Sequence, residues 1–161
     1  CVMIILGLDP GLASFGWAIL EKDRKSGLSI GDCGVIKTPA GELLGNRLCK
    51  IESELKDIIK NNVPDMASIE ELFFVKNIKT AMAVSHARGV AILACSRAGL
   101  KINEFTPIQV KQALTGYGQA DKKQVGFMVQ KILKMQTLPK DDNTVDAIAL
   151  GICLAHSCGV V

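Results

Sequence analysis

The sequence predicts an α/β fold in which one five-stranded mixed sheet is flanked by helices. Short apolar runs rich in β-branched residues alternate with longer segments whose apolar residues recur every three or four positions. The first three runs are joined by short connections, which favours antiparallel pairing, whereas the later runs are separated by helices, which favours parallel pairing. No linker divides the 161 residues, so we expect a single domain over residues 1–161.

The five strands are predicted from runs that end at turn or charged residues. The first begins at Ile4 and ends at Asp9, because Pro10-Gly11 is typical of a turn. So short a turn makes a hairpin, and the charged loop 21–26 then leads to the third strand. The remaining strands are expected at Phe15–Leu20, Leu28–Thr38, Met66–Glu70 and Lys101–Phe105.

The helices are predicted from apolar spacing and from residues that begin or end helices. Leu44, Leu48 and Ile51 illustrate the spacing of three and four that makes a helix amphipathic. Gly99 is a helix stop, and Gln124 follows Asp121 by three residues, as in a capping box. The helices are expected at Glu42–Asn61, Lys79–Ala98, Pro107–Leu114 after the N-cap Thr106, Lys122–Leu133 after the N-cap Asp121, and Asp142–His156.

Composition argues against several classes of protein. No uninterrupted apolar run approaches the roughly 18 residues that span a membrane, and the N-terminal run is too short for a secretory signal. Met3 is expected to be the natural start, with Cys1 and Val2 a cloning remnant. No C-x-x-C spacing occurs, so the cysteines are expected to be small buried side chains in a reducing cytoplasm rather than zinc ligands. They are Cys1, Cys33, Cys49, Cys95, Cys153 and Cys158.

Charge is distributed unevenly along the chain. The segment from Lys76 to Lys134 has a net charge of +8, and the remainder has −5. A basic half beside an acidic cluster suits a polyanion held against a metal site. Ordinary solvated helix faces would explain the charge alone equally well.

Acidic residues lie at the ends of three predicted elements. Asp9 ends the first strand and Glu70 ends the fourth, while Asp146 lies one turn inside the last helix. An ionised carboxylate beside an apolar core costs free energy unless a cation compensates for its charge. Oxygen ligands of this kind suit Mg²⁺, and two such ions can clamp the attacking water and the leaving oxygen of a phosphodiester. The sequence therefore predicts one site that holds divalent metal.

Each of these acidic residues also has a purely structural explanation. Asp9 fits a turn before Pro-Gly, and Glu70 fits a solvated strand end. Asp141 and Asp142 fit a helix N-terminus, where negative charge is favoured by roughly 0.3–1 kcal/mol. Asp146 fits no such explanation well, because it lies on the apolar side of its helix. Asp142 shares its helical face with Asp146 and is a further candidate metal ligand.

Several motifs, taken in order along nearly the whole chain, resemble the RuvC family of bacterial Holliday-junction resolvases. The strand and turn Leu6-Gly7-Leu8-Asp9-Pro10-Gly11 alone would be weak, since a similar turn occurs in actin-like ATPases. The further motifs have similar spacing to the family's and make the resemblance specific. They are Ser68-Ile69-Glu70-Glu71-Leu72-Phe73-Phe74-Val75-Lys76-Asn77, Ala87-Arg88-Gly89, Gln109-Val110-Lys111-Gln112 and Asp146-Ala147-Ile148-Ala149.

The resemblance implies a ribonuclease-H-like fold and a structure-selective endonuclease that resolves four-way DNA junctions by paired nicks, in recombination and repair. It implies a homodimer in the bacterial cytoplasm, with the branch-migration proteins RuvA and RuvB as partners. Carried over by position, Asp9, Glu70 and Asp146 are the family's metal-binding carboxylates. The expected cofactor is Mg²⁺, with Mn²⁺ able to substitute and two ions per site.

The resemblance also implies residues that contact DNA. Lys111 and Lys122 fall where the family places basic residues near the cleaved backbone. Phe73 falls where an aromatic ring lies close to the junction centre, and stacking on an unpaired base would contribute roughly 1–3 kcal/mol. Core packing is the alternative for Phe73. The full expected set of DNA-binding residues is Phe73, Lys76, Arg88, Lys111, Lys122 and Lys123.

Asn143 departs from the family pattern, which has a fourth catalytic acid at this position. An amide offers an oxygen but no charge, so metal affinity and any general-base role should fall. Asn143 is either an engineered replacement of Asp that traps uncut substrate, or a natural residue beside which Asp142 substitutes. The first explanation predicts a chain that binds junctions and cuts them poorly or not at all.

Two other functions compete with a junction nuclease. Asn143 motivates a catalytically inactive module that only binds DNA junctions. Asp9-Pro10-Gly11 alone motivates an actin-like kinase, but such kinases need a second phosphate loop and about twice this length. If the chain dimerises, the helix Lys79–Ala98, rich in small residues, is the expected interface.

Overall fold

A computed structural model of the chain describes residues 2–71 and 78–158. The described strands form one sheet in the order β3-β2-β1-β4-β5. They are β1 (Val2–Asp9), β2 (Ser14–Asp23), β3 (Gly27–Lys37), β4 (Met66–Glu70) and β5 (Lys101–Phe105). The helices are α1 (Leu44–Asn62), α2 (Ile78–Arg97), α3 (Pro107–Thr115), α4 (Lys122–Ile132) and α5 (Asp142–Ser157).

The pairing of the strands confirms the predicted mixed sheet. β1, β2 and β3 pair antiparallel, whereas β1–β4 and β4–β5 pair parallel. The second strand is longer than predicted, because Glu21–Asp23 continue the ladder with β3 and only residues 24–26 turn. That turn is stabilised by Asp23, whose Oδ1 accepts from the backbone N–H groups of Lys25 and Ser26 at 2.8 and 3.0 Å. The prediction that the second strand ends at Leu20 is therefore wrong. It was based on the charged residues that follow, and in a solvent-exposed hairpin charged side chains can occupy strand positions.

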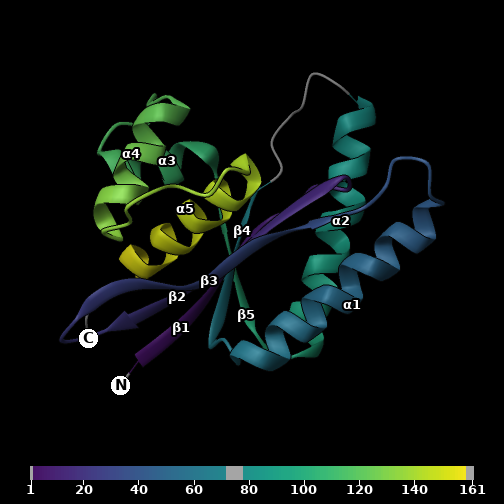
Figure 1. The fold of residues 1–161 in the computed structure, drawn as a ribbon, viewed down its shortest axis with the longest axis horizontal. Coiled ribbons are helices and arrows are strands. Elements are labelled where there is room, and N and C mark those ends of the chain that lie inside the picture. Colours follow the sequence, from purple (N-terminus) through teal and green to yellow (C-terminus); the bar gives the residue numbers. More distant parts are fainter. Residues whose placement is uncertain (1, 72–77, 159–161) are drawn as a thin grey trace.

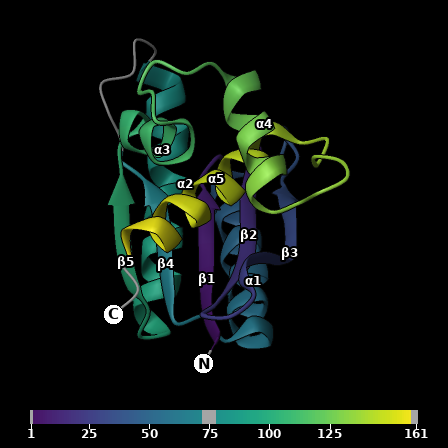
Figure 2. The ribbon, with the colours of Figure 1, turned by 90° about the vertical axis from the view of Figure 1, so that its left-hand side faces the viewer.

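Helices cover both faces of the sheet. Figure 1 shows the sheet between α1 and α2 on one side and α3, α4 and α5 on the other, and Figure 2 shows α5 crossing the strands. Successive side chains of β1 point to opposite faces of the sheet. Leu6 and Leu8 pack with α1 and α2, while Ile5 packs with α5. The residues after Ile5 with the same parity, Gly7 and Asp9, therefore face α5.

The helix α5 lies unusually close to the sheet. An added Cβ at Gly7 would collide with the carbonyl oxygen of Ala147, and one at Gly16 would collide with that of Asn143. Glycine is required at these positions by the close approach, because no side chain fits between strand and helix. At the other end of α5, the Lys22 ammonium donates to the carbonyls of Ala155 and Cys158, which stabilises the C-terminus of the helix. α5 is thereby fixed along its length.

Three details of the helices refine the sequence predictions. α1 begins at Leu44, two residues later than expected, and its N-cap Leu43 makes no side-chain cap. Cys95 and Cys153 are buried as predicted, but Cys49 is exposed on the outer side of α1, so its predicted burial is wrong. No helix in residues 2–71 and 78–158 is long and apolar enough to cross a membrane.

Candidate active site

Asp9 and Glu70 end two neighbouring parallel strands. The register pairs Leu8 with Ile69, so the next residues along, Asp9 and Glu70, follow at the same edge of the sheet. Adjacent strands lie about 4.8 Å apart. Strand alternation also sends both side chains to the α5 face, because Ala67 and Ile69 pack on the opposite side with α1 and α2. The sheet alone therefore brings these two carboxylates together.

Asp146 approaches the same edge from α5. The helix begins at the N-cap Asp141, whose Oδ1 accepts from the backbone N–H of Asn143 at 3.0 Å, as expected for a capping residue. The close packing of α5 over Gly7 and Gly16 then places the first turns of the helix above the ends of β1 and β2. Asp146 lies close enough to Asp9 and Glu70 for its charge to raise the pKa of each.

The site concentrates negative charge in a poorly solvated place. Burial, followed by the charges of Asp146 and Glu70, raises the pKa of Asp9 to about 7. Burial is also the main cause that raises the pKa of Glu70 and of Asp146. Carboxylates whose ionisation is opposed in this way need a cation, which is the electrostatic condition for a metal site.

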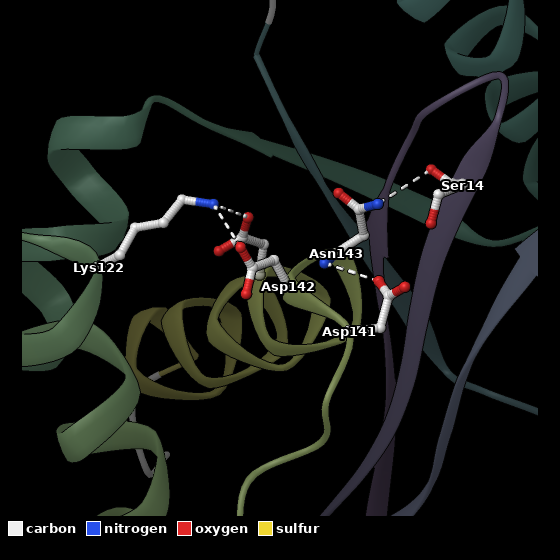
Figure 3. Close-up of polar contacts among 6 residues, drawn as sticks. Ser14, Lys122, Asp141, Asp142 and Asn143 are labelled. Carbon is white, nitrogen blue, oxygen red and sulfur yellow. Dashed lines mark hydrogen bonds and ion pairs between the residues drawn. The ribbon is translucent and has the colours of Figure 1, made fainter.

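Lys122 supplies positive charge at this point. It is the first residue of α4, and its Nζ lies 3.5 Å from Asp146 Oδ2 and 3.7 Å from Asp142 Oδ2. Figure 3 shows its side chain reaching from α4 toward α5 and the Asp142 carboxylate. The charge of Asp146, the largest cause, raises the pKa of Lys122, so the ammonium stays protonated. Sequence placed Lys122 near a cleaved backbone; the structure places it directly against a predicted metal ligand.

Asn143 has a specific partner that sequence reasoning missed. Its Nδ2 donates to the backbone carbonyl oxygen of Ser14 at 3.3 Å, as Figure 3 shows. An ionised aspartate at this position has no proton to donate and would face the carbonyl with like charge. Nothing in the sequence links residues 14 and 143, which meet only because α5 packs on β2.

The donor chemistry fits a divalent metal, although the carboxylates are not drawn together around one point. The charge of Asp146 raises the pKa of Asp9 and of Glu70, and hard oxygen donors are what Mg²⁺ and Mn²⁺ prefer. No group of three or more acidic, His or Cys side chains among the described residues is tight enough to hold an ion as it stands. The side chains must converge when an ion binds.

Arg88 has contacts within the protein that the sequence did not indicate. Its Nε donates to the backbone carbonyl of Glu70 at 3.2 Å, and its guanidinium forms an ion pair with Glu104 of β5. The side chain is only 15% exposed. These contacts hold the end of β4 in place, so Arg88 supports Glu70 from within the protein, and contact with DNA stays a prediction.

The other predicted DNA-binding residues are placed as follows. Lys111 on α3 is near enough for its charge to lower the pKa of Glu70, against the larger effect of burial. Lys123 is exposed and lines a groove beside α4. Phe73 and Lys76 lie outside the described residues, so their predicted roles stay predictions.

Comparison with known proteins gives a consistent assignment. The family model described as "Crossover junction endodeoxyribonuclease RuvC" matches residues 5–154. Proteins of that name from Halothermothrix orenii and Chloroflexus aggregans are 48% and 45% identical over 155 residues, which cover 96% of this chain and 93% and 94% of theirs.

Solved structures agree with the sequence relatives. The structure of "T. thermophilus RuvC in complex with Holliday junction substrate" superposes with a TM-score of 0.91 at 29% identity, covering 96% of this chain and 94% of that one. The yeast mitochondrial resolvase Ydc2, at 11% identity and a TM-score of 0.68, shares the fold. The ribonuclease-H-like architecture is thus confirmed, and the chain belongs to the RuvC family of crossover junction endodeoxyribonucleases.

Proposed function

We propose that this chain nicks four-way DNA junctions, with divalent metal held by Asp9, Glu70 and Asp146. The observation that carries the proposal is the meeting of three carboxylates from β1, β4 and α5 at one edge of the sheet. They lie close enough that the charges of Asp146 and Glu70, together with burial, raise the pKa of Asp9 to about 7. Family membership adds the reaction, and the Holliday junction bound by the Thermus thermophilus relative adds the substrate class.

The acidic residues and the lysines at the site have different proposed roles. Asp9, Glu70 and Asp146 would hold two Mg²⁺ ions, or Mn²⁺ in their place, with Asp142 as a further ligand from the same face of α5. When bound, such ions neutralise phosphate charge and supply a water that attacks at neutral pH. Lys122 would turn from Asp146 to the cleaved phosphate, and Lys111 would hold the neighbouring backbone.

Asn143 is proposed here to be compatible with cleavage. Its hydrogen bond to the Ser14 carbonyl supports a residue adapted to its surroundings, because an ionised aspartate lacks the donor. The bond fixes the amide nitrogen and leaves the amide oxygen as a neutral ligand at the site. The alternative, a module that binds junctions without cutting them, predicts that the chain nicks only after Asn143→Asp.

The decisive experiment follows nicking of a synthetic four-way junction by purified chain in Mg²⁺ and in Mn²⁺. We expect symmetric nicks by the parent, and a loss of at least about 100-fold in rate for Glu70→Gln with junction binding retained. Glu71→Gln is the matched control, since Glu71 is the adjacent exposed acid. Binding by the parent and by Asn143→Asp without nicking at any metal concentration would reject the catalytic assignment.

A homodimer is the proposed form, with α2 at its interface. Ile78, Met82 and Leu93 are large, apolar and exposed on α2, and Gly89 between them has no atom within 4 Å of an added Cβ. Ala87 and Ala91 of the expected small-residue stripe are buried with α1 in the same chain, so that part of the stripe is not available. Two sites related by a two-fold axis would suit two opposed nicks.

Substitution of Gly89 tests the dimer. Gly89→Leu should improve helix propensity in the monomer by roughly 1 kcal/mol while it blocks close approach of a second helix. We expect sedimentation to show dissociation, and nicks on the two strands to become uncoupled. A dimer of unchanged affinity would exclude this face of α2. Cooperation with RuvA and RuvB in the bacterial cytoplasm belongs to the same proposal and rests on the family alone.

A further inference from the structure

A groove beside α4 is lined by Lys123, the residue after Lys122, and has no role in the mechanism above. It has a volume of about 520 Å³, and its walls include Thr115, Tyr117, Lys123 and Phe127. We propose that this α4 groove binds one unstacked nucleotide of the DNA strand next to the cleaved phosphate, with Phe127 and Tyr117 as stacking surfaces. The inference rests on the proposed function only in taking Lys122 as the residue that meets the cleaved phosphate.

The two aromatic rings are exposed without belonging to the core. Phe127 is 56% exposed and Tyr117 is 60% exposed, whereas Val125 and Val129 on the opposite side of α4 are buried. The buried valines fix the orientation of α4, so the exposure of Phe127 is imposed by the packing of the helix. Large apolar side chains held in solvent around a groove indicate a surface that is covered when a partner binds.

The wall opposite α4 is held by a network of hydrogen bonds. Thr115 Oγ1 donates to the Lys111 carbonyl at 2.7 Å and accepts from the Tyr117 N–H at 3.1 Å. Gly116 has a positive φ of 73° and ends α3, which turns the chain toward Tyr117. Asp121 and Gln124 form a capping box at the start of α4. Both walls are therefore built before any ligand arrives.

The charge of the groove suits a polyanion. Lys123, Phe127 and Lys131 follow one another at intervals of four residues and lie on one face of α4. The Lys131 ammonium lies 5.4 Å from the centroid of the Phe127 ring, a cation–π distance. Among the residues that the structure describes, none that lines the groove is acidic. Aromatic rings interleaved with lysines are the surface on which single-stranded nucleic acids bind.

Lys123 connects the groove to the candidate site. It follows Lys122, whose Nζ lies 3.5 Å from Asp146. Phe127 lies one turn beyond Lys123 on the same face of α4, about 6 Å along the helix axis. Lys122 leaves the helix about 140° around the axis from Phe127. A strand whose phosphate meets Lys122 would therefore reach the Phe127 ring by passing over Lys123, which lines the groove.

A stacking site of this kind distinguishes a junction from a duplex. In a paired duplex both faces of each base are already covered by neighbours, so an exposed ring gains little. At a four-way junction the strands exchange partners, and a base there can leave its stack at a small cost. The α4 groove would thus add affinity only where the DNA is already distorted, which contributes to selection of structure over sequence.

The test scans a single 2-aminopurine through the junction strand, one position at a time, on both sides of the mapped nick. Binding is measured without divalent metal so that the DNA stays intact. We expect quenching at one position on one side of the nick. Phe127→Leu should remove that quenching and weaken junction binding roughly fivefold or more. Phe127→Trp should retain both, because it keeps a stacking ring. Val63→Ala, which shortens an apolar side chain of similar exposure beyond the C-terminus of α1, is the control.

The outcomes separate this inference from the proposed function. Nicking by the parent without quenching at any position overturns the stacking site and leaves the nuclease intact. Quenching that depends on Phe127 in a chain that never nicks supports the stacking site and rejects the catalytic assignment. Equal quenching and affinity in the parent and in Phe127→Leu overturns the inference.

Discussion

On the face of the sheet that α1 and α2 cover, β1 and β4 contribute a core of buried apolar side chains: Leu6, Leu8, Ala67 and Ile69. On the face that α5 covers, the same two strands end in Asp9 and Glu70. One pair of strands thus provides a stable core on one side and a charged, poorly solvated edge on the other. The difference teaches that the stability of this domain and its chemistry can be altered separately, by substitution on opposite faces.

The packing of α5 on the strands is where the two faces depend on each other, so its disruption should have the largest effect. In Gly16→Ala the new Cβ collides with the Asn143 carbonyl, and α5 must move away from the sheet. We expect a loss of roughly 3 kcal/mol in the free energy of unfolding and no measurable nicking. Denaturant unfolding and the junction assay check both. The control Gly45→Ala, where the Cβ meets nothing within 4 Å, should be at least as stable as the parent. A stable, active Gly16→Ala chain would contradict the tight packing.

A cavity on the α1 face should affect stability alone. Leu55 is fully buried with α1 and α2, on the face of the sheet opposite the carboxylates. Leu55→Ala should cost about 3 kcal/mol in the free energy of unfolding. The rate of nicking at 20 °C should stay within about twofold of the parent, because the site is carried by the other layer. A large loss of rate in a fully folded chain would show that the faces are coupled.

Neutralising Asp9 should increase the free energy of unfolding, whereas most substitutions decrease it. The folded chain holds the Asp9 proton up to about pH 7, and the unfolded chain only up to its ordinary pKa of 3.8. The stability of the parent therefore falls as pH rises from about 4 to 7, and Asp9→Asn lacks that fall. Each pKa unit corresponds to roughly 1.4 kcal/mol, so the variant should melt several degrees higher at pH 8 and about equally at pH 4.

The same variant separates stability from metal binding. Mg²⁺ should raise the melting temperature of the parent at pH 8 and less at pH 5, because a protonated Asp9 is a poor ligand. Asp9→Asn should show little increase at either pH and should not nick. If Asp9→Asn melts lower than the parent at pH 8, Asp9 contributes favourable contacts that outweigh its burial.

Substitution of Arg88 should have the smallest effect on nicking, and it distinguishes support of Glu70 from contact with DNA. Arg88 contacts the Glu70 carbonyl and Glu104, so Arg88→Gln should lower kcat roughly tenfold through a displaced Glu70. Junction affinity and its salt dependence should stay unchanged. Loss of a side chain that binds phosphate would instead lower affinity and reduce the salt slope by about one, as we expect for Lys123→Gln. A salt slope reduced by about one in Arg88→Gln would support the predicted role of Arg88 in DNA binding.

Local sequence determined every strand and helix described here to within a few residues. Turn residues, apolar spacing and the caps Thr106 and Asp121 are short-range signals, and they act before distant segments meet. The acidic positions were also evident, because a carboxylate at the end of an apolar strand is conspicuous whatever the fold. Their positions at element ends predicted a shared metal site, and the family resemblance added the reaction that we propose for it.

Tertiary structure alone decided which side chains meet. Lys122 against Asp146, Asn143 against the Ser14 carbonyl, and Arg88 against Glu70 join residues that are 18 to 129 positions apart. These contacts depend on the packing of α5, α4 and α2 on particular strands, and the same residue types would have looked alike facing solvent. A basic residue has one charge but many possible partners, so only the folded arrangement separates Arg88, which supports the site, from Lys122, which lies within it.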